Sequence, residues 1–330
     1  MSRLETTRRG RCITVQLMDD GVAKLMRAMN DTFPDLSTIS AVDARAVLVG
    51  RRPPVANLDD VASADDLLIP GQGGDLRVRV YRPHGDSHSR AAVVFAHGGG
   101  FVLCDLDSHD SFCRAMSRHT DTVVVSVDYR LAPEHRAPAA AEDVFAAWCW
   151  TIEHADDLGV DSQRVLVAGD SAGGNLAAVT ALMCRERGAR MPAGQLLIYP
   201  VIEPFFDTES YRKYSTGYVN TRDAMQYYWR QYLDDKMPSP EYLVAPARAT
   251  SHEGLPPAIV VTAGFDVLQS EGASYAHKLR AANVAVVHRD YPGLFHGFLT
   301  MMPFSAGAAG RELLWADMAR LLAIDVEATA

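Results

Sequence analysis

Short apolar runs that alternate with helical segments constrain the fold of this chain more than any other feature of its sequence. The runs are rich in β-branched residues, which is typical of parallel strands covered on both faces. They comprise residues 91–96, 122–127, 164–168, 195–199, 258–262 and 284–287. Helical periodicity occurs in residues 111–119, 139–154, 172–187, 268–282 and 311–322. The alternation predicts an α/β fold with a mostly parallel central sheet flanked by helices, and functional residues at the carboxyl ends of its strands.

The domain organisation follows from where this alternation stops. Residues 1–70 contain helical stretches before the sheet, and residues 201–249 separate two strand patterns by far more than a crossover connection needs. We therefore predict one sheet domain, formed by residues 71–200 and 250–330, with the other two segments added to it. Residues 76–81 alternate apolar and polar side chains, as a strand at the sheet margin would. Because nine aromatic residues lie between positions 205 and 232, we interpret the 201–249 insertion as a lid.

Charge and cysteine content limit the partners and the compartment. The chain has 32 Lys and Arg against 41 Asp and Glu, and its net charge of −9 disfavours nucleic acids and anionic membranes as ligands. Its five cysteines are an odd number without a C-x-x-C pair, which indicates reduced, buried thiols. No apolar signal region follows the N-terminal arginines, and no stretch reaches the length of a membrane span. We expect a cytoplasmic protein without an integral membrane segment.

A candidate nucleophile lies in Gly169-Asp170-Ser171-Ala172-Gly173, between a predicted strand and a predicted helix. This G-x-S-x-G pattern is typical of a nucleophile elbow, a turn so tight that only small residues fit around the serine. The serine hydroxyl then projects from the top of the sheet. An ordinary glycine-rich turn would have the same five residues, so the motif requires catalytic partners elsewhere in the chain.

Those partners begin with His97-Gly98-Gly99-Gly100, at the end of an earlier predicted strand. Consecutive glycines let the backbone approach a ligand closely and turn its amides inward, as an oxyanion hole requires. We predict that Gly99 and Gly100 donate two of these amides. Ala172 would donate a third from the first turn of its helix, where N–H groups have no helical partner. We interpret His97 as a structural histidine rather than a base.

The general base is predicted to be His296, which lies between the last strand pattern and the last helix. His288 falls within a strand pattern and His277 within a helical one, so we interpret both as packing or surface residues. His84 and His88 have a spacing seen in zinc sites, but they share a turn with no helix to hold them. We therefore predict no metal site.

Asp266 is the predicted carboxylate of the triad, because it follows the strand pattern at 258–262. The order Ser171, Asp266, His296 is that of α/β-hydrolases. A helix N-cap is the competing role for Asp266, and Glu271 is the alternative acid. Asp105, Asp107 and Asp110 lie close to His109 in the sequence. We interpret this acidic cluster as a helix cap, formed by Asp107 or Ser108.

The combined motifs resemble those of the hormone-sensitive-lipase-like (family IV) esterases of the α/β-hydrolase superfamily. The similarity runs from about Tyr81 to Phe298. It includes residues 97–101, 128–134, 169–173, Asp266 and 295–298. The resemblance implies an α/β-hydrolase fold, a helical cap made from the N-terminus and the mid-chain insertion, no cofactor, and frequent dimerisation, so that a homodimer is expected. Ser270 departs from the family pattern, which commonly has a second Asp there, whereas Glu271 matches it.

The function predicted from these residues is that of a serine carboxylesterase. It would hydrolyse a short- to medium-chain carboxylic ester, a small-molecule substrate, through an acyl-enzyme formed on Ser171. Residues 128–134 would support the glycine loop. Two alternatives stay open: an amidase or peptidase that uses the same triad, and a small-molecule receptor on the same fold. Related gibberellin receptors lack the catalytic histidine, and the presence of His296 argues against that second alternative.

Overall fold

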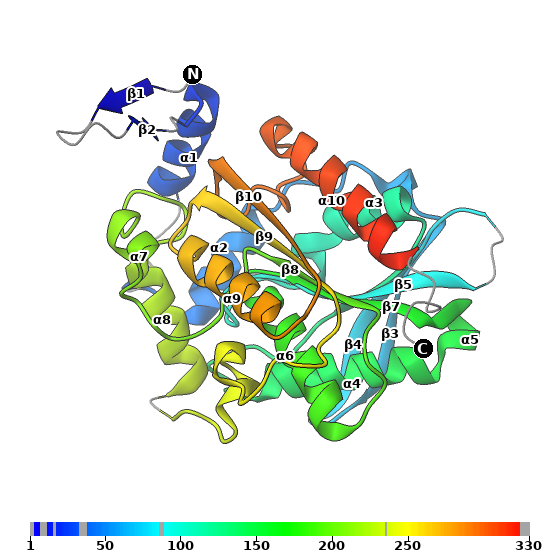
Figure 1. Cartoon of the computed structure of the whole chain (residues 1–330). Coiled ribbons are helices and arrows are strands. Elements are labelled where there is room, and N and C mark those ends of the chain that lie inside the picture. The colour runs from blue at the N-terminus through cyan, green and yellow to red at the C-terminus, as the bar shows by residue number, and fades with distance from the viewer. Residues whose placement is uncertain are drawn as a thin grey trace.

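The computed structural model describes residues 3–6, 12–15, 18–32, 38–85, 89–234 and 236–323. An eight-stranded sheet with the order β10-β9-β8-β7-β5-β6-β4-β3 runs through it (Figure 1). Its strands are β3 (Ser63–Gly71), β4 (Gly74–Arg82), β5 (Arg90–Ala96), β6 (Val123–Val127), β7 (Val160–Asp170), β8 (Gly194–Ile198), β9 (Ala258–Phe265) and β10 (Val286–Phe295). A separate hairpin pairs β1 (Arg3–Thr6) with β2 (Cys12–Val15). In the large sheet only β3 and β4 run antiparallel to their neighbours, so the predicted mostly parallel sheet is confirmed.

Helices cover both faces of this sheet (Figure 1). One face packs against α4 (Ala139–Glu153), α6 (Ala172–Arg187) and α9 (Gln269–Ala281), and the other against α3 (Asp110–Thr120) and α10 (Ala308–Leu322). The strands divide between the two cores by alternation. In β5, Val94 packs with the first group of helices, whereas Val93 and Phe95 pack with the second. Because side chains on both faces of these strands are buried, the strands appear in the sequence as continuous apolar runs.

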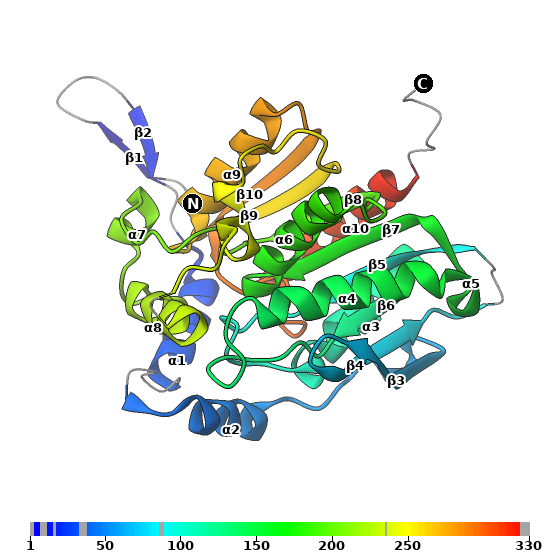
Figure 2. The same cartoon turned by 90° about the horizontal axis from the view of Figure 1, so that it is seen from below.

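The two added segments meet at one end of the sheet. In Figure 2, α1 (Asp20–Thr32), α2 (Ala41–Arg51), α7 (Glu209–Lys213) and α8 (Arg222–Leu233) all lie toward this end of the sheet. Asn30 of α1 donates a 2.7 Å hydrogen bond to the carbonyl of Gly217, which joins the N-terminal segment to the insertion. The remaining short helices are α5 (Ala155–Leu158), η2 (Leu58–Asp60), η3 (Leu106–His109), η4 (Glu241–Leu243), η5 (Pro246–Arg248) and η6 (Ser305–Gly307). None of the described helices combines the length and apolar character needed to cross a bilayer.

Two strands differ from the sequence-based expectation. The sheet begins at Ser63, inside the segment expected to precede it. The strand β3 lies at the sheet edge, and its apolar run is limited to residues 67–69, between Asp65-Asp66 and Pro70. At the opposite edge, β10 continues to Phe295, although Pro292 and Gly293 interrupt its pattern. Its pairing with β9 is irregular between Tyr291 and Phe295, and then resumes. The segment expected to be a loop before His296 is therefore largely strand.

Candidate active site

The register of the parallel strands brings the predicted site residues together. Phe265 of β9 pairs with Phe295 of β10, so the next residues of the two strands, Asp266 and His296, emerge side by side. Ser171 follows the last residue of β7, which pairs with Ile198 at the end of β8. All three residues therefore lie at carboxyl ends of strands, where open α/β sheets place their ligand sites.

Ser171, His296 and Asp266 form a continuous chain of hydrogen bonds. The Ser171 Oγ lies 3.0 Å from the His296 Nε2, and the His296 Nδ1 lies 2.6 Å from an Asp266 carboxylate oxygen. Because a carboxylate only accepts hydrogen bonds, Nδ1 carries the imidazole proton. The Nε2 lone pair then faces the serine hydroxyl, as a general base requires. Asp266 is fully buried and Ser171 is 7% exposed.

The sharp turn at Ser171 depends on the neighbouring glycines. Ser171 has φ 55° and ψ −116°, a conformation that L-residues adopt only under strain. A Cβ on Gly173 would collide with the carbonyl oxygen of Ala96, and one on Gly169 would collide with the backbone of Gly173. The strand-to-helix turn can therefore form only with glycine at both positions.

Asp266 has a second contact besides His296. Its other carboxylate oxygen accepts a hydrogen bond of 3.1 Å from the Leu268 N–H, next to the start of α9. Asp266 is not the N-cap of α9, because that position is Leu268 and no side chain caps the helix. This second bond fixes the carboxylate orientation toward the imidazole.

The glycine loop turns its backbone through positive φ angles. Gly99 has φ 113° and Gly100 has φ 62°, and the Gly99 carbonyl accepts from the amides of Val102 and Leu103. A Cβ on Gly99 would collide with the Leu103 carbonyl. Gly100 lies directly beneath the ring of Tyr228 from α8, which leaves no room for a side chain there. Close packing on both sides thus holds this backbone in one conformation.

His97 lies beneath this loop as a structural residue. Its Nδ1 donates a 2.7 Å hydrogen bond to the Gly98 carbonyl, and its ring stacks on Tyr129 at 4.3 Å. The Tyr129 hydroxyl donates to the His97 carbonyl oxygen. Burial, assisted by the nearby His109, lowers the pKa of His97 to about 4, so His97 is neutral at pH 7.

Residues 128–134 contact the glycine loop, as the sequence analysis expected. The Ala132 amide donates to the Phe101 carbonyl, and Arg45 of α2 donates to the carbonyls of Val102 and Ala132. Arg45 also forms an ion pair with Glu134. The N-terminal segment is therefore tied directly to the loop.

The acidic cluster after the loop caps a helix through Ser108, one of the two residues predicted, and through Asp105, which was not predicted. Asp105 is the N-cap of η3, and its side chain and that of Ser108 form a reciprocal capping box. Asp107 instead pairs with Arg52 and Arg79. The sequence spacing alone did not distinguish these acidic residues, because the choice depends on where the short helix begins.

Among the described residues, neither metal-binding side chains nor thiols form a second candidate site. Within that part of the chain no three His, Cys, Asp or Glu side chains are grouped to hold a metal ion. His88 lies outside the described residues, and the His84 Nε2 contacts the Asp59 carbonyl. Cys113 and Cys184 are buried free thiols, and burial raises the pKa of both. The side chain of Cys12 is likewise outside the described residues.

Glu271, the alternative acid, is directed away from the imidazole. One of its carboxyl oxygens accepts a 2.7 Å hydrogen bond from the Ile202 amide, and the other has no partner among the described residues. Burial, reinforced by the negative charge of Asp266, raises the pKa of Glu271 well above its usual range. Glu271 therefore supports the loop after β8 and does not orient His296.

Replacing Glu271 by Gln should raise stability at alkaline pH. A buried carboxyl with a raised pKa contributes stability that is complete below its unfolded value of 4.5 and is lost as the pH rises through its folded pKa. Gln keeps the acceptor for Ile202 without this loss. By calorimetry, we expect the Tm of Glu271→Gln at pH 8 to exceed that of the wild type by about 2 °C or more, with a smaller gain at pH 5.

The exposed Glu253→Gln is the matched control for this comparison, and its Tm should follow the wild type at both pH values. An equal or lower Tm of Glu271→Gln at pH 8 would show that the Glu271 carboxyl is ionised without cost in the folded protein.

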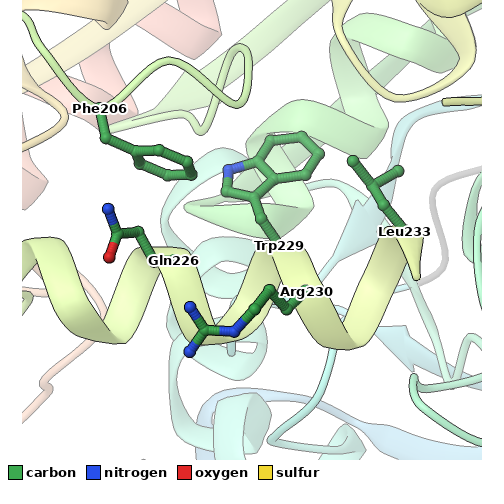
Figure 3. A pocket seen from close by; sticks show the side chains of 5 residues that line it. All are labelled: Phe206, Gln226, Trp229, Arg230 and Leu233. Atoms are coloured by element: carbon green, nitrogen blue, oxygen red, sulfur yellow. The ribbon is translucent and has the colours of Figure 1, made fainter. Parts of the chain in front are cut away.

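Two cavities lie near the added helices. The larger, about 880 Å³, is mainly apolar and is bounded by α1 and by residues 52–57, 104–112 and 300–306. A smaller one, about 350 Å³, lies on α8, where Phe206 and Trp229 approach each other (Figure 3). Gln226, Arg230 and Leu233 complete its lining. Neither cavity is bounded by Ser171 or His296.

Tyr199 is a residue of the site that the sequence analysis did not identify. Its ring lies 4.7 Å from the imidazole of His296, and its hydroxyl lies 3.2 Å from the Thr300 Oγ. Thr300 lines the large cavity, so Tyr199 connects that cavity to the base. The feature that could have identified Tyr199 is its position directly after β8, at the same sheet edge as Ser171, Asp266 and His296.

Comparison with known proteins places the chain among hydrolases. A family model described as the alpha/beta hydrolase fold matches residues 93–300. "Carboxylic ester hydrolase LipN" of Mycobacterium tuberculosis is 44% identical over 78% of this chain and 70% of its own length. "Carboxylesterase NlhH" of the same species is 38% identical over 88% and 93%. The crystal structure of a thermostable esterase from Pseudomonas putida has a TM-score of 0.88 and 33% identity, covering 94% of this chain and 99% of that one.

Proposed function

The chain belongs to the α/β-hydrolase fold family as a hormone-sensitive-lipase-like carboxylesterase, and on this premise we propose how its residues divide the reaction. Ser171 is the nucleophile, His296 the general base, and Asp266 the carboxylate that orients the base. The observation that carries this assignment is the hydrogen-bond chain of 3.0 Å and 2.6 Å through the imidazole. It matches the geometry by which a base takes a proton from a nucleophile.

The reaction then proceeds in two steps. The Ser171 Oγ attacks the carbonyl carbon of the ester while its proton passes to the His296 Nε2. The carbonyl oxygen becomes negatively charged and accepts from the amides of Gly99, Gly100 and Ala172. The tetrahedral intermediate collapses as His296 returns the proton to the leaving alcohol. Water, deprotonated by the same imidazole, releases the acid from the acyl-enzyme.

Two features support the oxyanion assignment. The loop at Gly99 and Gly100 has positive φ angles and is packed on both sides, so its amides need no reorganisation during the reaction. Ala172 is the first residue of α6, where a helix N-terminus favours negative charge. Because side chains and backbone amides supply every group required, the proposed mechanism needs neither a metal nor a cofactor.

The substrate we propose is a small-molecule ester with a short to medium chain. The 880 Å³ cavity is largely apolar and adjoins Tyr199 through Thr300, which suits an aliphatic acyl or alcohol group. We assign the helices of the 1–70 segment, which precede β3, and residues 201–249 to a cap over the site, supported by the contacts of Arg45 and Tyr228 with the glycine loop. The sheet domain is then formed by residues 71–200 and 250–330 together with β3, which begins at Ser63.

The cellular setting is part of the same proposal. A cytoplasmic location suits the four cysteines whose side chains the structure describes, all of them free thiols. The net charge of −9 argues against nucleic acid as a partner. We propose a homodimer as the assembly, which sedimentation at micromolar concentration would test.

A panel of p-nitrophenyl esters tests the substrate assignment. From acetate through butyrate and octanoate to palmitate, kcat/KM should be highest for butyrate or octanoate and lower by about tenfold or more for palmitate. The matching anilides should stay intact, because their amine leaving group is poorer. Hydrolysis of anilides at comparable rates would favour an amidase, and binding of the esters without turnover would favour a receptor.

A further inference from the structure

The nucleophile elbow and the glycine loop share one buried carboxylate. Asp170, the residue before Ser171, is 4% exposed. Its Oδ1 accepts a 2.8 Å hydrogen bond from the Gly98 amide and lies 3.1 Å from the His109 Nε2. The pairing of Ala96 with Gly169 makes this contact possible, because it brings Asp170, the next residue of β7, close to the glycine loop that follows β5. Asp170 thus links two loops that hold different parts of the proposed machinery.

The hydrogen bonds around His109 define its protonation. Ser108 has a single hydroxyl proton, and it donates that proton to the Asp105 carbonyl at 2.6 Å. At the 3.0 Å contact between the Ser108 Oγ and the His109 Nδ1, the oxygen must therefore accept and Nδ1 must donate. On the other side of the ring, Nε2 lies 3.1 Å from the Asp170 Oδ1. Without a proton, Nε2 would direct its lone pair at this negatively charged oxygen, so Nε2 is protonated as well. With a proton on both nitrogens, His109 is an imidazolium.

The other charges around the pair agree with this assignment. Burial alone would raise the pKa of Asp170, but the charge and hydrogen bond of His109 outweigh it, and the pKa lies below its usual value. His97, whose ring centre is 5.7 Å from that of His109, is neutral and adds no charge to the pair. The carboxylate and the imidazolium therefore form a buried pair without net charge.

We propose that His109 and Asp170 form a positioning ion pair, separate from the triad, that fixes the oxyanion loop against the nucleophile elbow. The inference rests on the proposed role of Gly99 and Gly100 as oxyanion donors. A carboxylate is the strongest acceptor available for the Gly98 amide. Alone, its negative charge beside Ser171 would oppose the developing oxyanion. The imidazolium cancels that charge while the hydrogen bond stays in place.

A double-mutant cycle with Asp170→Asn and His109→Gln tests this pair. His109→Gln keeps a donor near Nε2 but removes the positive charge, and Asp170→Asn removes the negative one. Each single variant should lower kcat for p-nitrophenyl butyrate by about 30-fold or more, with KM changed by about threefold at most. The double variant, which has a neutral pair, should recover to within about tenfold of the wild type.

A second readout separates positioning from general damage. Trifluoromethyl ketones bind esterases as tetrahedral oxyanions, so their inhibition constants should rise in each single variant in parallel with the loss of kcat. The control is the ion pair of the partly exposed Arg289 with the buried Asp317, which has two 2.8 Å bonds between β10 and α10. Arg289→Gln and Asp317→Asn should lower Tm but leave kcat and ketone binding unchanged.

The outcomes distinguish this inference from the proposed function. If both single variants keep kcat within about threefold of the wild type, the proposed role of the ion pair is wrong. It is also wrong if the fold-loss of kcat in the double variant equals the product of the fold-losses in the two single variants. If a single variant does not fold, the double variant and the remaining single still decide the result. Labelling of wild-type Ser171 by a phosphonate is measured in parallel. Its absence would overturn the nucleophile assignment itself, whatever the variants do.

Discussion

Ser171→Ala should lower kcat for p-nitrophenyl butyrate by about 10⁵-fold or more, the largest effect expected of any single change in this protein. The hydroxyl is the only group of the proposed site that forms a bond to substrate carbon, so its removal eliminates the acyl-enzyme. KM should change little, since the binding surfaces remain. Steady-state kinetics measures both values, and an equal Tm would show that the variant is folded.

Covalent labelling identifies the nucleophile independently of rates. A p-nitrophenyl phosphonate should add one phosphonyl group to the wild-type chain, at the peptide that contains Ser171, and none to Ser171→Ala. Ser126, fully buried in β6, provides the matched control. Ser126→Ala should be labelled and active like the wild type. An adduct at another residue, or full activity in Ser171→Ala, would contradict the proposed mechanism.

Asp266→Asn is expected to lower kcat by about 10⁴-fold while the fold is retained. The Asn side chain can donate its amide N–H to His296 Nδ1 at the position of the present 2.6 Å bond. Nδ1 would then accept, and the imidazole proton would move to Nε2. A protonated Nε2 cannot take the proton of Ser171, so the nucleophile stays inactive although every residue remains in place.

The comparison with Glu271→Gln decides between the two acids. Glu271 bonds to the Ile202 amide and has no contact with the imidazole, so Glu271→Gln should keep kcat within about threefold. If Asp266→Asn kept near-normal activity while Glu271→Gln lost it, Glu271 would be the orienting carboxylate and the hydrogen-bond chain through Asp266 would not be catalytic.

Local motifs made the nucleophile and the glycine loop predictable. The pentapeptide around Ser171 and the glycines after His97 are each continuous in sequence, and their residue types alone are typical of tight turns. The contacts that hold these turns, with Ala96 and Tyr228, come from distant parts of the chain. The structure accordingly has positive φ angles at Gly99, Gly100 and Ser171. The core helices begin and end close to their predicted bounds, because their apolar faces repeat with helical periodicity.

Residues whose environment depends on distant partners were not predictable in the same way. The edge strand β3 combines Asp65-Asp66 with a short apolar stretch at 67–69, and its pairing with β4 identifies it as part of the sheet. Asp105 rather than Asp107 caps η3, because the cap is fixed by where the turn starts. Tyr199, His109 and Asp170 belong to no pattern that links them, although all lie near the carboxyl ends of strands.

The sequence by itself determined the fold class, the order of the proposed triad residues and the positions of the two glycine-containing turns. Only the tertiary structure decided which acid faces His296 and which contacts hold His109 between Ser108 and Asp170. The physical reason is the range of the interactions. Turn geometry and helical periodicity are local, whereas hydrogen-bond direction depends on strand register between distant residues, such as the pairing of Phe265 with Phe295 that places Asp266 beside His296.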